Sequence, residues 1–509
     1  MGEQGKGKKR IQKSGLYLLT SVVYLLLFSA YTSPLFPKFL KYDSAVFMMI
    51  SKSILSGKQL YVDAFDHKGP IFYSFETIGM IGGRIGVFLL QTVFLWADLL
   101  LLDRMTGLFL DETEDKGTGT ARGTRAAGRW FVIGMTLLLL AYPLANGNLT
   151  EEYSLPFIFL PLYLFLKDMR IEGKPRLSHS YAYGICFGIL AFIRLNNAVT
   201  ICAIILYWMI VLIKQGQWKK LLSHLGIGLL GIATIVIPSL FYFLIRNSLY
   251  EMIYAVFLFN LRYSTGSGFL QRLASLNTWA HLVILFAPLV LAMLVFGGRI
   301  RDGRLKAALE LILVLNMVSL FLGQGYNHYF TLTVPLEAFM CICMIGRPDN
   351  NRKESETAPN RFLELLLRIG FAGVAAGYGI LAVRIIALNI RDYYVDDGVR
   401  KEYEVVQDCL SDIPDEERDE VLGYLVPAEY YLMGDVIPCF RYAVLQESWG
   451  SIDEQIIEDT MQCLSGKEAK WVMITTEEYS NQEAIALIRE NYELVKGNEY
   501  CILYRRREE

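Results

Sequence analysis

Residues 41–73 have the sequence KYDSAVFMMISKSILSGKQLYVDAFDHKGPIFY, directly after an apolar run at 14–37 that contains no charged residue. About 20 apolar residues are enough to cross the roughly 30 Å hydrocarbon core of a membrane. The quoted stretch is therefore predicted to be a loop at the membrane surface. Its ionisable side chains include Asp43, Asp63, Asp66, His67 and Lys68.

Of the 509 residues of the chain, 53% are hydrophobic and 20% are charged, and further apolar runs account for this composition. This is an apolar excess over an ordinary soluble domain. The net charge of -2 and the absence of a basic stripe argue against a nucleic-acid partner. We expect about eleven transmembrane helices, at 14–37, 85–110, 130–145, 152–166, 181–193, 197–213, 221–245, 279–297, 306–322, 329–346 and 369–390.

The Lys and Arg residues of the short connections predict the orientation. Basic clusters occupy alternate connections, at 116–129, 167–176, 214–220, 299–304 and 347–353, and the connections at 146–151 and 323–328 hold no Lys or Arg. Cytoplasmic loops are the ones enriched in these residues. We therefore expect a multi-pass protein of the cell membrane with a cytoplasmic N-terminus, an uncleaved first span and an extracytoplasmic C-terminal region.

Two regions are expected to lie outside the membrane on that side. In the first external loop, 38–84, a short interfacial helix is expected at 44–56 and an amphipathic segment at 70–81, with a similar segment at 249–263. In the C-terminal region, strands at 420–426 and 471–476 and a hairpin at 492–504 alternate with helical patterns at 452–464 and 481–491. The expected architecture is a helical membrane domain, 1–390, followed by a small soluble α/β domain, 391–509, that covers the outer face.

The eight cysteines divide evenly between these two parts. Four lie in predicted spans, where cysteine packs as a small hydrophobic residue. The other four lie in the external domain, where disulfides are allowed, although their spacing does not suggest zinc: Cys409, Cys439, Cys463 and Cys501.

Acidic residues gather at the predicted external ends of spans. Asp43 follows the first span closely, and Glu151 and Glu152 lie at the start of another. Any one of them fits a solvated loop. At membrane depth, however, an uncompensated charge is costly, and a carboxylate on a partly dry surface is suited to taking a proton from a hydroxyl.

The order of four motifs resembles the GT-C glycosyltransferases, and in particular their bacterial branch related to protein mannosyltransferases and the aminoarabinose lipid A transferase. The first motif, G-x-x-x-Y-x-D-x-F-D-x-K-x-P, runs from Gly57 to Pro70. It is followed by NLTEEYSLPF at 148–157, FIRLNN at 192–197 and NHYFTLTVP at 327–335. The resemblance covers nearly all of the membrane part and only loosely the soluble region.

This resemblance implies transfer of a sugar from a polyprenyl-phosphate carrier to an acceptor hydroxyl on the outer face, with inversion at the sugar. It assigns Asp43 as general base and Glu151 or Glu152 as a second carboxylate that orients the acceptor or a metal. Because a lipid phosphate is already a good leaving group, cations that hold it are needed rather than a strong acid. The candidates for this role are Lys68, Arg194, Arg262 and His328.

Other residues of the motifs are expected to shape the site: Tyr61, Asp63, Asp66, His67, Asn327 and Tyr329. Arg194 fits a snorkelling side chain equally well, and His328 a hydrogen-bonded interfacial one. Part of the family uses a divalent cation, so a metal is left open, with Asp43, Asp66, His67 and Glu151 as its candidate ligands. No other cofactor is expected.

Three alternatives remain. A transporter or flippase for lipid-linked sugars would need polar groups near mid-span and internal repeats. A polymerase or ligase of surface polysaccharide would be expected to carry its large loop late in the chain, and a sensor would leave the first loop unexplained. The sugar, the acceptor (protein, lipid or glycan) and the oligomeric state are not specified by the sequence.

Overall fold

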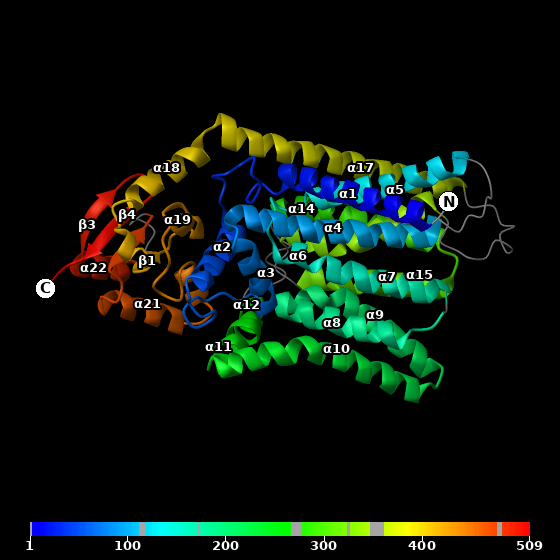
Figure 1. Ribbon diagram of the computed structural model, residues 1–509, viewed down its shortest axis with the longest axis horizontal. Coiled ribbons are helices and arrows are strands. Elements are labelled where there is room, and N and C mark those ends of the chain that lie inside the picture. Colours follow the sequence, from blue (N-terminus) through cyan, green and yellow to red (C-terminus); the bar gives the residue numbers. More distant parts are fainter. Residues whose placement is uncertain are drawn as a thin grey trace.

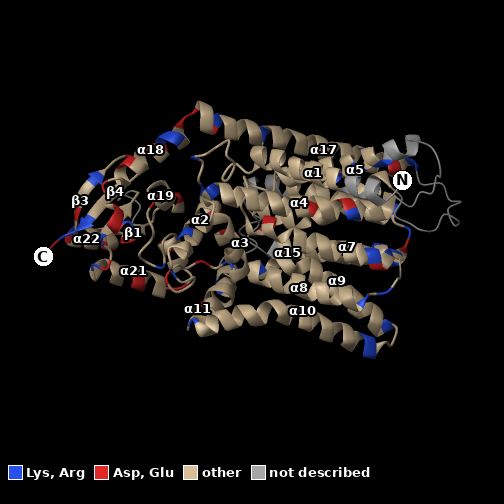
Figure 2. Ribbon diagram, in the orientation of Figure 1, with Lys and Arg blue, Asp and Glu red and all other residues tan. Residues whose placement is uncertain are grey.

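A bundle of long helices forms one part of the molecule, and a smaller part made of short helices and a sheet lies at one end of it (Figure 1). The computed structural model describes residues 3–110, 119–171, 173–265, 276–322, 326–346, 361–475 and 481–508. Figure 2 shows that charged residues concentrate at the two ends of the bundle and over the smaller part, with few along the middle of the helices.

Each predicted span overlaps one long helix of the described chain. These helices are α1 (Glu3–Phe28), α4 (Gly83–Leu110), α5 (Gly119–Ala141), α7 (Pro156–Ile171), α8 (Leu177–Arg194), α9 (Val199–Lys214), α10 (Trp218–Ile245), α14 (Leu276–Arg299), α15 (Gly303–Leu322), α16 (Val334–Ile345) and α17 (Arg361–Ile390).

The described residues contain six segments that are long and apolar enough to cross a membrane, which indicates a multi-pass membrane protein. One of them, Leu177–Lys214, joins α8 and α9 through the 3-10 turn η1 (Leu195–Ala198). Other bundle helices, such as α7, have fewer than the roughly 20 residues that a straight crossing needs. The count of eleven crossings therefore stays a prediction.

The first predicted span was drawn too long. The helix α1 ends at Phe28, and residues 29–41 form a series of turns instead. Pro34 and Pro37 lie in this segment, and proline is unfavourable in a helix interior. Arg84, at the start of α4, donates hydrogen bonds to the carbonyls of Ala30, Tyr31 and Phe36 at 2.6–2.9 Å. These bonds satisfy backbone groups that a continuing helix would have used.

The first external loop forms two helices, α2 (Tyr42–Leu55) and α3 (Pro70–Met80), which confirms that the segments at 44–56 and 70–81 are helical. Eight residues of α2 are buried, and it packs against α19 (Ala428–Met433); its location at the membrane surface stays a prediction. Its apolar side chains therefore contact protein.

The segment at 249–263 is also helical, and further short elements lie between the long helices. They are α6 (Thr150–Ser154), α11 (Leu249–Ile253), the π-helical turn η2 (Tyr254–Phe259), α12 (Asn260–Thr265) and the 3-10 turn η3 (Asn327–Thr333).

The C-terminal part contains a four-stranded sheet of order β1-β2-β4-β3, formed by β1 (Val421–Tyr424), β2 (Trp471–Ile474), β3 (Tyr492–Gly497) and β4 (Ile502–Arg506). β1 and β2 are parallel, and the other two pairs are antiparallel. The predicted strands, hairpin and α/β character are confirmed; the boundary at 390/391 stays a prediction. The other elements of this part are η4 (Arg391–Val395), α18 (Gly398–Leu410), η5 (Asp415–Glu417), α19, α20 (Gln446–Gly450), α21 (Gln455–Ser465) and α22 (Gln482–Asn491).

All eight cysteines lie among the described residues, and each is a free thiol. Cys409 on α18 lies against the start of β4, where its thiol donates to the carbonyl of Cys501 at 3.6 Å. The four cysteines of the C-terminal part thus contribute to its core as reduced side chains.

The C-terminal part packs directly on the first external loop. The amide of Phe65 donates to the carbonyl of Arg441 at 2.9 Å, and the Phe65 ring meets Trp449 edge to face. Lys41 pairs with Glu402 at 2.7 Å. The loop and the C-terminal part therefore lie on the same side of the bundle.

This packing and the Lys/Arg bias together predict a labelling pattern. Single cysteines are placed at exposed positions 63, 435 and 219 in a cysteine-free background. We expect an impermeant maleimide to label Asp63→Cys and Asp435→Cys on intact cells, and Lys219→Cys only after permeabilisation. Different accessibility at 63 and 435 would contradict the packing, and equal labelling at all three positions would contradict the predicted orientation.

Candidate functional site

A buried ion pair joins three elements at the end of the bundle that faces the C-terminal part. Arg194, the last residue of α8, donates from Nη1 to Oε1 of Glu151 on α6 at 2.9 Å. Its Nη2 donates to the hydroxyl of Tyr329 on η3, and its guanidinium lies 4.3 Å from the centre of that ring. Thr150 donates to the other carboxylate oxygen of Glu151 at 2.9 Å. Three of the four sequence motifs thus meet here: NLTEEYSLPF through Glu151, FIRLNN through Arg194 and NHYFTLTVP through Tyr329.

A close backbone approach brings the first loop to the same place. The amide of Gly69 donates to the carbonyl of Ile193 at 3.0 Å. A Cβ at Gly69 would lie 2.1 Å from the carbonyl oxygen of Phe192, so only glycine allows this approach. Because Lys68 and Arg194 each adjoin a residue of this contact, the contact draws the two cations of separate motifs together.

Lys68 belongs to a buried row of polar side chains. Its Nζ lies 2.7 Å from Nε2 of His67, and Tyr73 on α3 donates to Oδ2 of Asp66 at 2.5 Å. The backbone of this row is fixed as well, because Tyr61 donates to the carbonyl of Lys68 and Asn260 donates to that of His67, each at 2.7 Å. The row is therefore rigidly held from both sides.

The charges around these groups set their ionisation. Burial raises the pKa of Asp66, but the Lys68 charge, the adjacent His67 and the hydrogen bond from Tyr73 outweigh it and leave that pKa below its usual value. Burial and the Lys68 charge lower the pKa of His67 to about 3. Burial likewise raises the pKa of Glu151, but His328 and Arg194 bring it below the ordinary value. At neutral pH the two carboxylates are ionised, and His67 is a neutral imidazole that accepts from Lys68.

Asp43 lies in the first turn of α2 and is exposed. Within the part of the chain that the structure describes, its carboxylate accepts no hydrogen bond. It interacts electrostatically with His328, which also interacts with Glu151, Arg194 and Lys68. The Asp43 carboxylate therefore lies at the open edge of the cation cluster.

A second buried network, which the sequence analysis missed apart from Glu152, lies behind the ion pair. Oε2 of Glu152 accepts from Gln91 on α4 at 2.8 Å and from the amide of Asn148 at 2.9 Å. The side-chain amide of Asn148 donates to Oε1 of Glu76 at 2.9 Å and to Oγ of Ser44 at 3.0 Å. Asn148 thus connects its own loop to Ser44 on α2, the residue that follows Asp43.

Tyr153 and an unusual backbone complete this network. The Tyr153 hydroxyl lies 3.1 Å from Oε2 of Glu76 and 2.9 Å from Oδ1 of Asn148. Burial raises the pKa of Glu76 to about 7, although the hydrogen bonds that its carboxylate accepts act to lower that pKa. Residues 145–148 all have positive φ, and a Cβ at Gly147 would lie 2.0 Å from Oγ of Ser29. A run of this kind is costly and persists only where surrounding contacts hold it.

The sequence held two signals for this network. Gln91 is a polar residue in the otherwise apolar first part of its span, 85–91, and residues 145–148, ANGN, are rich in residue types that tolerate positive φ. Glu76 gave a weaker signal, because an acid on an amphipathic segment is normally solvent-exposed. Adjacent Glu151 and Glu152 therefore face different partners, the first Arg194 and the second the buried network.

Other predicted site residues lie around the edge. The exposed carboxylate of Asp63 accepts from the amide of Gln59 at 2.7 Å and closes a turn. Arg262 on α12 pairs with Asp453 of the C-terminal part at 2.7 Å, and Asp453 also accepts from Tyr254. Asn327 is half-buried at the start of η3. The structure thus joins Glu151 and Arg194 directly and brings the backbone beside Lys68 against that beside Arg194, while Asp43 and His328 interact with this group electrostatically and Arg262 lies on the side of the C-terminal part.

Three of the four candidate metal ligands are already engaged with other side chains, and Asp43 is the exception. Asp66 accepts from Tyr73, Glu151 from Arg194, and His67 is bonded to Lys68. Among the described residues, no group of three or more His, Cys, Asp or Glu side chains is placed to hold a metal ion. In this arrangement the residues do not fit a metal.

Comparison with known proteins identifies the fold. No family model matches the sequence, and no curated protein matches it. Among solved structures, ArnT from Cupriavidus metallidurans bound to undecaprenyl phosphate matches with a TM-score of 0.58 and 14% identity, over 96% of this chain and 97% of that chain. The Archaeoglobus fulgidus oligosaccharyltransferase in complex with Zn and sulfate matches with a TM-score of 0.52 and 12% identity, over 96% and 73%. The chain has the GT-C fold that its motifs predicted.

The Gly69 contact gives a direct test of this geometry. Gly69→Ala should lower the free energy of unfolding by about 1–3 kcal/mol, because the added methyl group meets backbone atoms that cannot turn away. Gly134→Ala is the matched control, since Gly134 lies in α5 with no atom within 4 Å of the added Cβ. Thermal unfolding of the two variants in the same detergent would measure the difference. Equal stability would show that the first loop does not depend on this approach.

Proposed function

We propose that this chain is a membrane glycosyltransferase that moves a sugar from a polyprenyl-phosphate donor to an acceptor hydroxyl. One observation carries the proposal: an exposed carboxylate, Asp43, lies at the edge of a buried cluster of cations formed by separate loops of a GT-C fold. The ArnT structure is described as bound to undecaprenyl phosphate, which supports a lipid phosphate as the carrier.

The donor phosphate is assigned to Arg194, Lys68 and His328. A guanidinium has five N–H groups, and among the described residues Arg194 donates only to Glu151 and Tyr329. Its remaining N–H groups match the geometry of phosphate oxygens. Lys68 makes one side-chain hydrogen bond, to His67, and an ammonium has three donors. Both cations therefore keep donors for a phosphate while their positions stay fixed.

Arg262 is a fourth candidate for binding the donor phosphate, and it differs from the other three in its exposure and its partner. Its guanidinium is about half exposed and pairs with Asp453. To bind the donor it would have to exchange this carboxylate for the phosphate. Its contribution would then depend on the position of the C-terminal part relative to α12.

Asp43 is proposed as the general base. Its carboxylate takes the acceptor proton as the acceptor oxygen forms a bond to the anomeric carbon of the sugar. The bond from that carbon to the phosphate oxygen breaks, and polyprenyl phosphate leaves with the electron pair. Attack from the face opposite the phosphate inverts the anomeric centre, as in single-displacement glycoside chemistry. The preformed cations stabilise the charge that develops on the leaving phosphate.

The two glutamates are proposed to have separate roles. Glu151 is the second carboxylate of the site, because its charge fixes Arg194 and faces His328. Glu152 accepts from Gln91 and from the amide of Asn148, so it holds the loop that carries Glu151. Loss of the Glu152 carboxylate would act on the reaction through that loop.

Replacement of the base gives the first test of this function. Asp43→Asn removes the proton acceptor but keeps the size of the side chain, so turnover should fall by roughly 10²–10⁴-fold. Donor affinity should stay unchanged, because the phosphate is held by other residues. Transfer is measured with purified protein and a panel of radiolabelled polyprenyl-phosphate sugars. Asp63→Asn, an exposed acid of the same loop, is the control, and an equal loss in both variants would contradict the assignment.

Removal of a side chain that binds the phosphate should separate donor binding from the chemical step. Arg194→Ala should weaken binding of the donor by roughly 10–100-fold, the effect of losing a hydrogen bond to a charged group. Acceptor affinity should change far less. Since Glu151 would then be buried without its partner, the double variant Arg194→Ala with Glu151→Gln is measured in parallel to keep the fold intact. Unchanged donor affinity in the folded double variant would assign Arg194 a structural role alone.

A further inference from the structure

The C-terminal part places one large aromatic side chain against the first external loop. Trp449 on α20 is 3% exposed, and its ring lies edge to face with the rings of Phe65 and His67, at centroid distances of 5.4 and 6.2 Å. It meets Phe259 of η2 in the same way at 6.2 Å. A side chain from a distant segment of the sequence thus contacts the loop that carries Lys68.

Trp449 is held firmly by the C-terminal part itself. Gln446, fully buried at the start of α20, donates to the carbonyl of Gly423 on β1 at 2.7 Å. A Cβ at Gly450 would lie 2.3 Å from Cγ1 of Ile457, so α20 packs closely on α21. The sheet therefore fixes the position of α20, and with it the position of the Trp449 ring.

The geometry of the ring contacts fixes orientation as well as position. The interplanar angles between Trp449 and the rings of Phe65, His67 and Phe259 are 74°, 84° and 79°. Edge-to-face pairs of this kind have a preferred geometry and contribute more than the area that they bury. A side chain without a ring would fill the space but would not hold these three planes.

The His67 ring is the link between Trp449 and the cation. Tyr263 on α12 stacks on the imidazole at 5.3 Å, and Phe259 lies 6.0 Å from it. With Trp449 against it as well, the imidazole is enclosed by rings from three elements. Its Nε2 lies 2.7 Å from Nζ of Lys68. The direction of the Lys68 ammonium therefore depends on the orientation of the His67 ring.

We infer that Trp449 of the C-terminal part is a positioning residue for the donor phosphate: it orients His67, which in turn directs the Lys68 ammonium toward that phosphate. The inference rests on the proposed function, in which Lys68 binds the polyprenyl phosphate. The C-terminal part is then a component of the donor site. Arg194 keeps its own partners, Glu151 and Tyr329, when the Trp449 ring is removed.

The test measures binding of a radiolabelled polyprenyl phosphate, which carries no sugar, to the purified full-length protein in detergent. Trp449→Leu should weaken binding by about 10-fold, since a misdirected Lys68 loses a hydrogen bond to a charged group. Trp449→Phe keeps an aromatic ring at this position and should bind within about two-fold of the wild-type protein.

A double-variant cycle separates positioning from packing. Lys68→Met removes the ammonium that Trp449 is inferred to position. Trp449→Leu should then cause no further loss of affinity in the Lys68→Met protein, because residues of one network do not act additively. A general weakening of the fold would add the same loss, about 10-fold, with or without Lys68.

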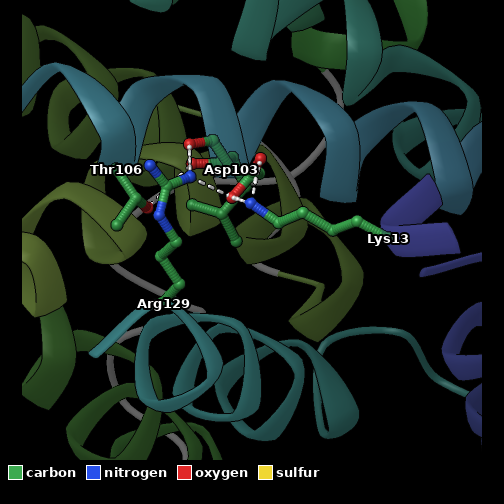
Figure 3. Close-up of polar contacts among 5 residues, drawn as sticks. Lys13, Asp103, Thr106 and Arg129 are labelled. Atoms are coloured by element: carbon green, nitrogen blue, oxygen red, sulfur yellow. Dashed lines mark hydrogen bonds and ion pairs between the residues drawn. The ribbon is translucent and has the colours of Figure 1, made fainter. Parts of the chain in front are cut away.

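One control perturbs the helical bundle away from the site. At the end of the bundle opposite the C-terminal part, Lys13 and Arg129 both donate to the carboxylate of Asp103 on α4 (Figure 3). Asp103→Asn weakens these contacts and should leave the affinity for polyprenyl phosphate unchanged.

The matched control removes a second tryptophan of the C-terminal part. Trp471 on β2 is equally buried, at 3% exposed, and donates from Nε1 to Glu417 at 2.7 Å. Trp471→Leu should keep the wild-type affinity. Melting temperatures without lipid identify the variants that are folded. If Trp449→Leu does not fold, Trp449→Met, which also lacks a ring but fills more of the space, takes its place.

The possible results distinguish the inference from the function on which it rests. Wild-type affinity in the folded Trp449 variant, or an equal loss in the Lys68→Met protein, would overturn the inference and leave the proposed function standing. Equal losses in Trp449→Leu and Trp471→Leu would assign Trp449 to packing alone. A wild-type protein that binds no polyprenyl phosphate would overturn the proposed function and the inference with it.

Discussion

The ion pair of Arg194 with Glu151 is the interaction on which the arrangement of the external end depends. Both side chains are largely buried, and a buried charge is tolerated only where a partner and further hydrogen bonds satisfy it. Thr150 and Tyr329 supply those bonds, so the end of α8, the short helix α6 and η3 are held in one geometry. The first loop is attached to this unit by backbone contact at Gly69, which places Lys68 near Arg194.

Behind this unit, the fold holds a second set of polar groups that never reach solvent. Asn148 connects Glu152, Glu76 and Ser44, and its own backbone lies in the left-handed region. In front of it, the C-terminal part covers the first loop through Phe65 and Trp449 and is joined to α12 by the pair of Arg262 and Asp453. Arg194 and Lys68 thus lie between the buried polar network around Asn148 and the C-terminal part of the same chain.

Much of the fold followed from the sequence because hydrophobic runs and strand patterns are local properties. The helices α4 and α10 and the strands β1 and β2 lie within a few residues of the predicted segments. The end of α1 was misplaced, since the apolar pattern continues through Pro34 and the competing bonds come from Arg84, which is distant in sequence. The packing of α2 against the C-terminal part was also not predicted, because an apolar helix face does not show whether lipid or protein covers it.

The residues of the site could be chosen from motifs, but their partners could not. Nothing local indicates that adjacent Glu151 and Glu152 point toward different networks, or that Arg262 is paired with Asp453. The most direct test of the account is a cryo-electron microscopy structure with a bound polyprenyl phosphate. We expect the phosphate within about 3 Å of donors on Arg194 and Lys68, with Asp43 facing it across the space for the sugar. A phosphate bound elsewhere, with Arg194 and Lys68 contacting only protein, would contradict the account.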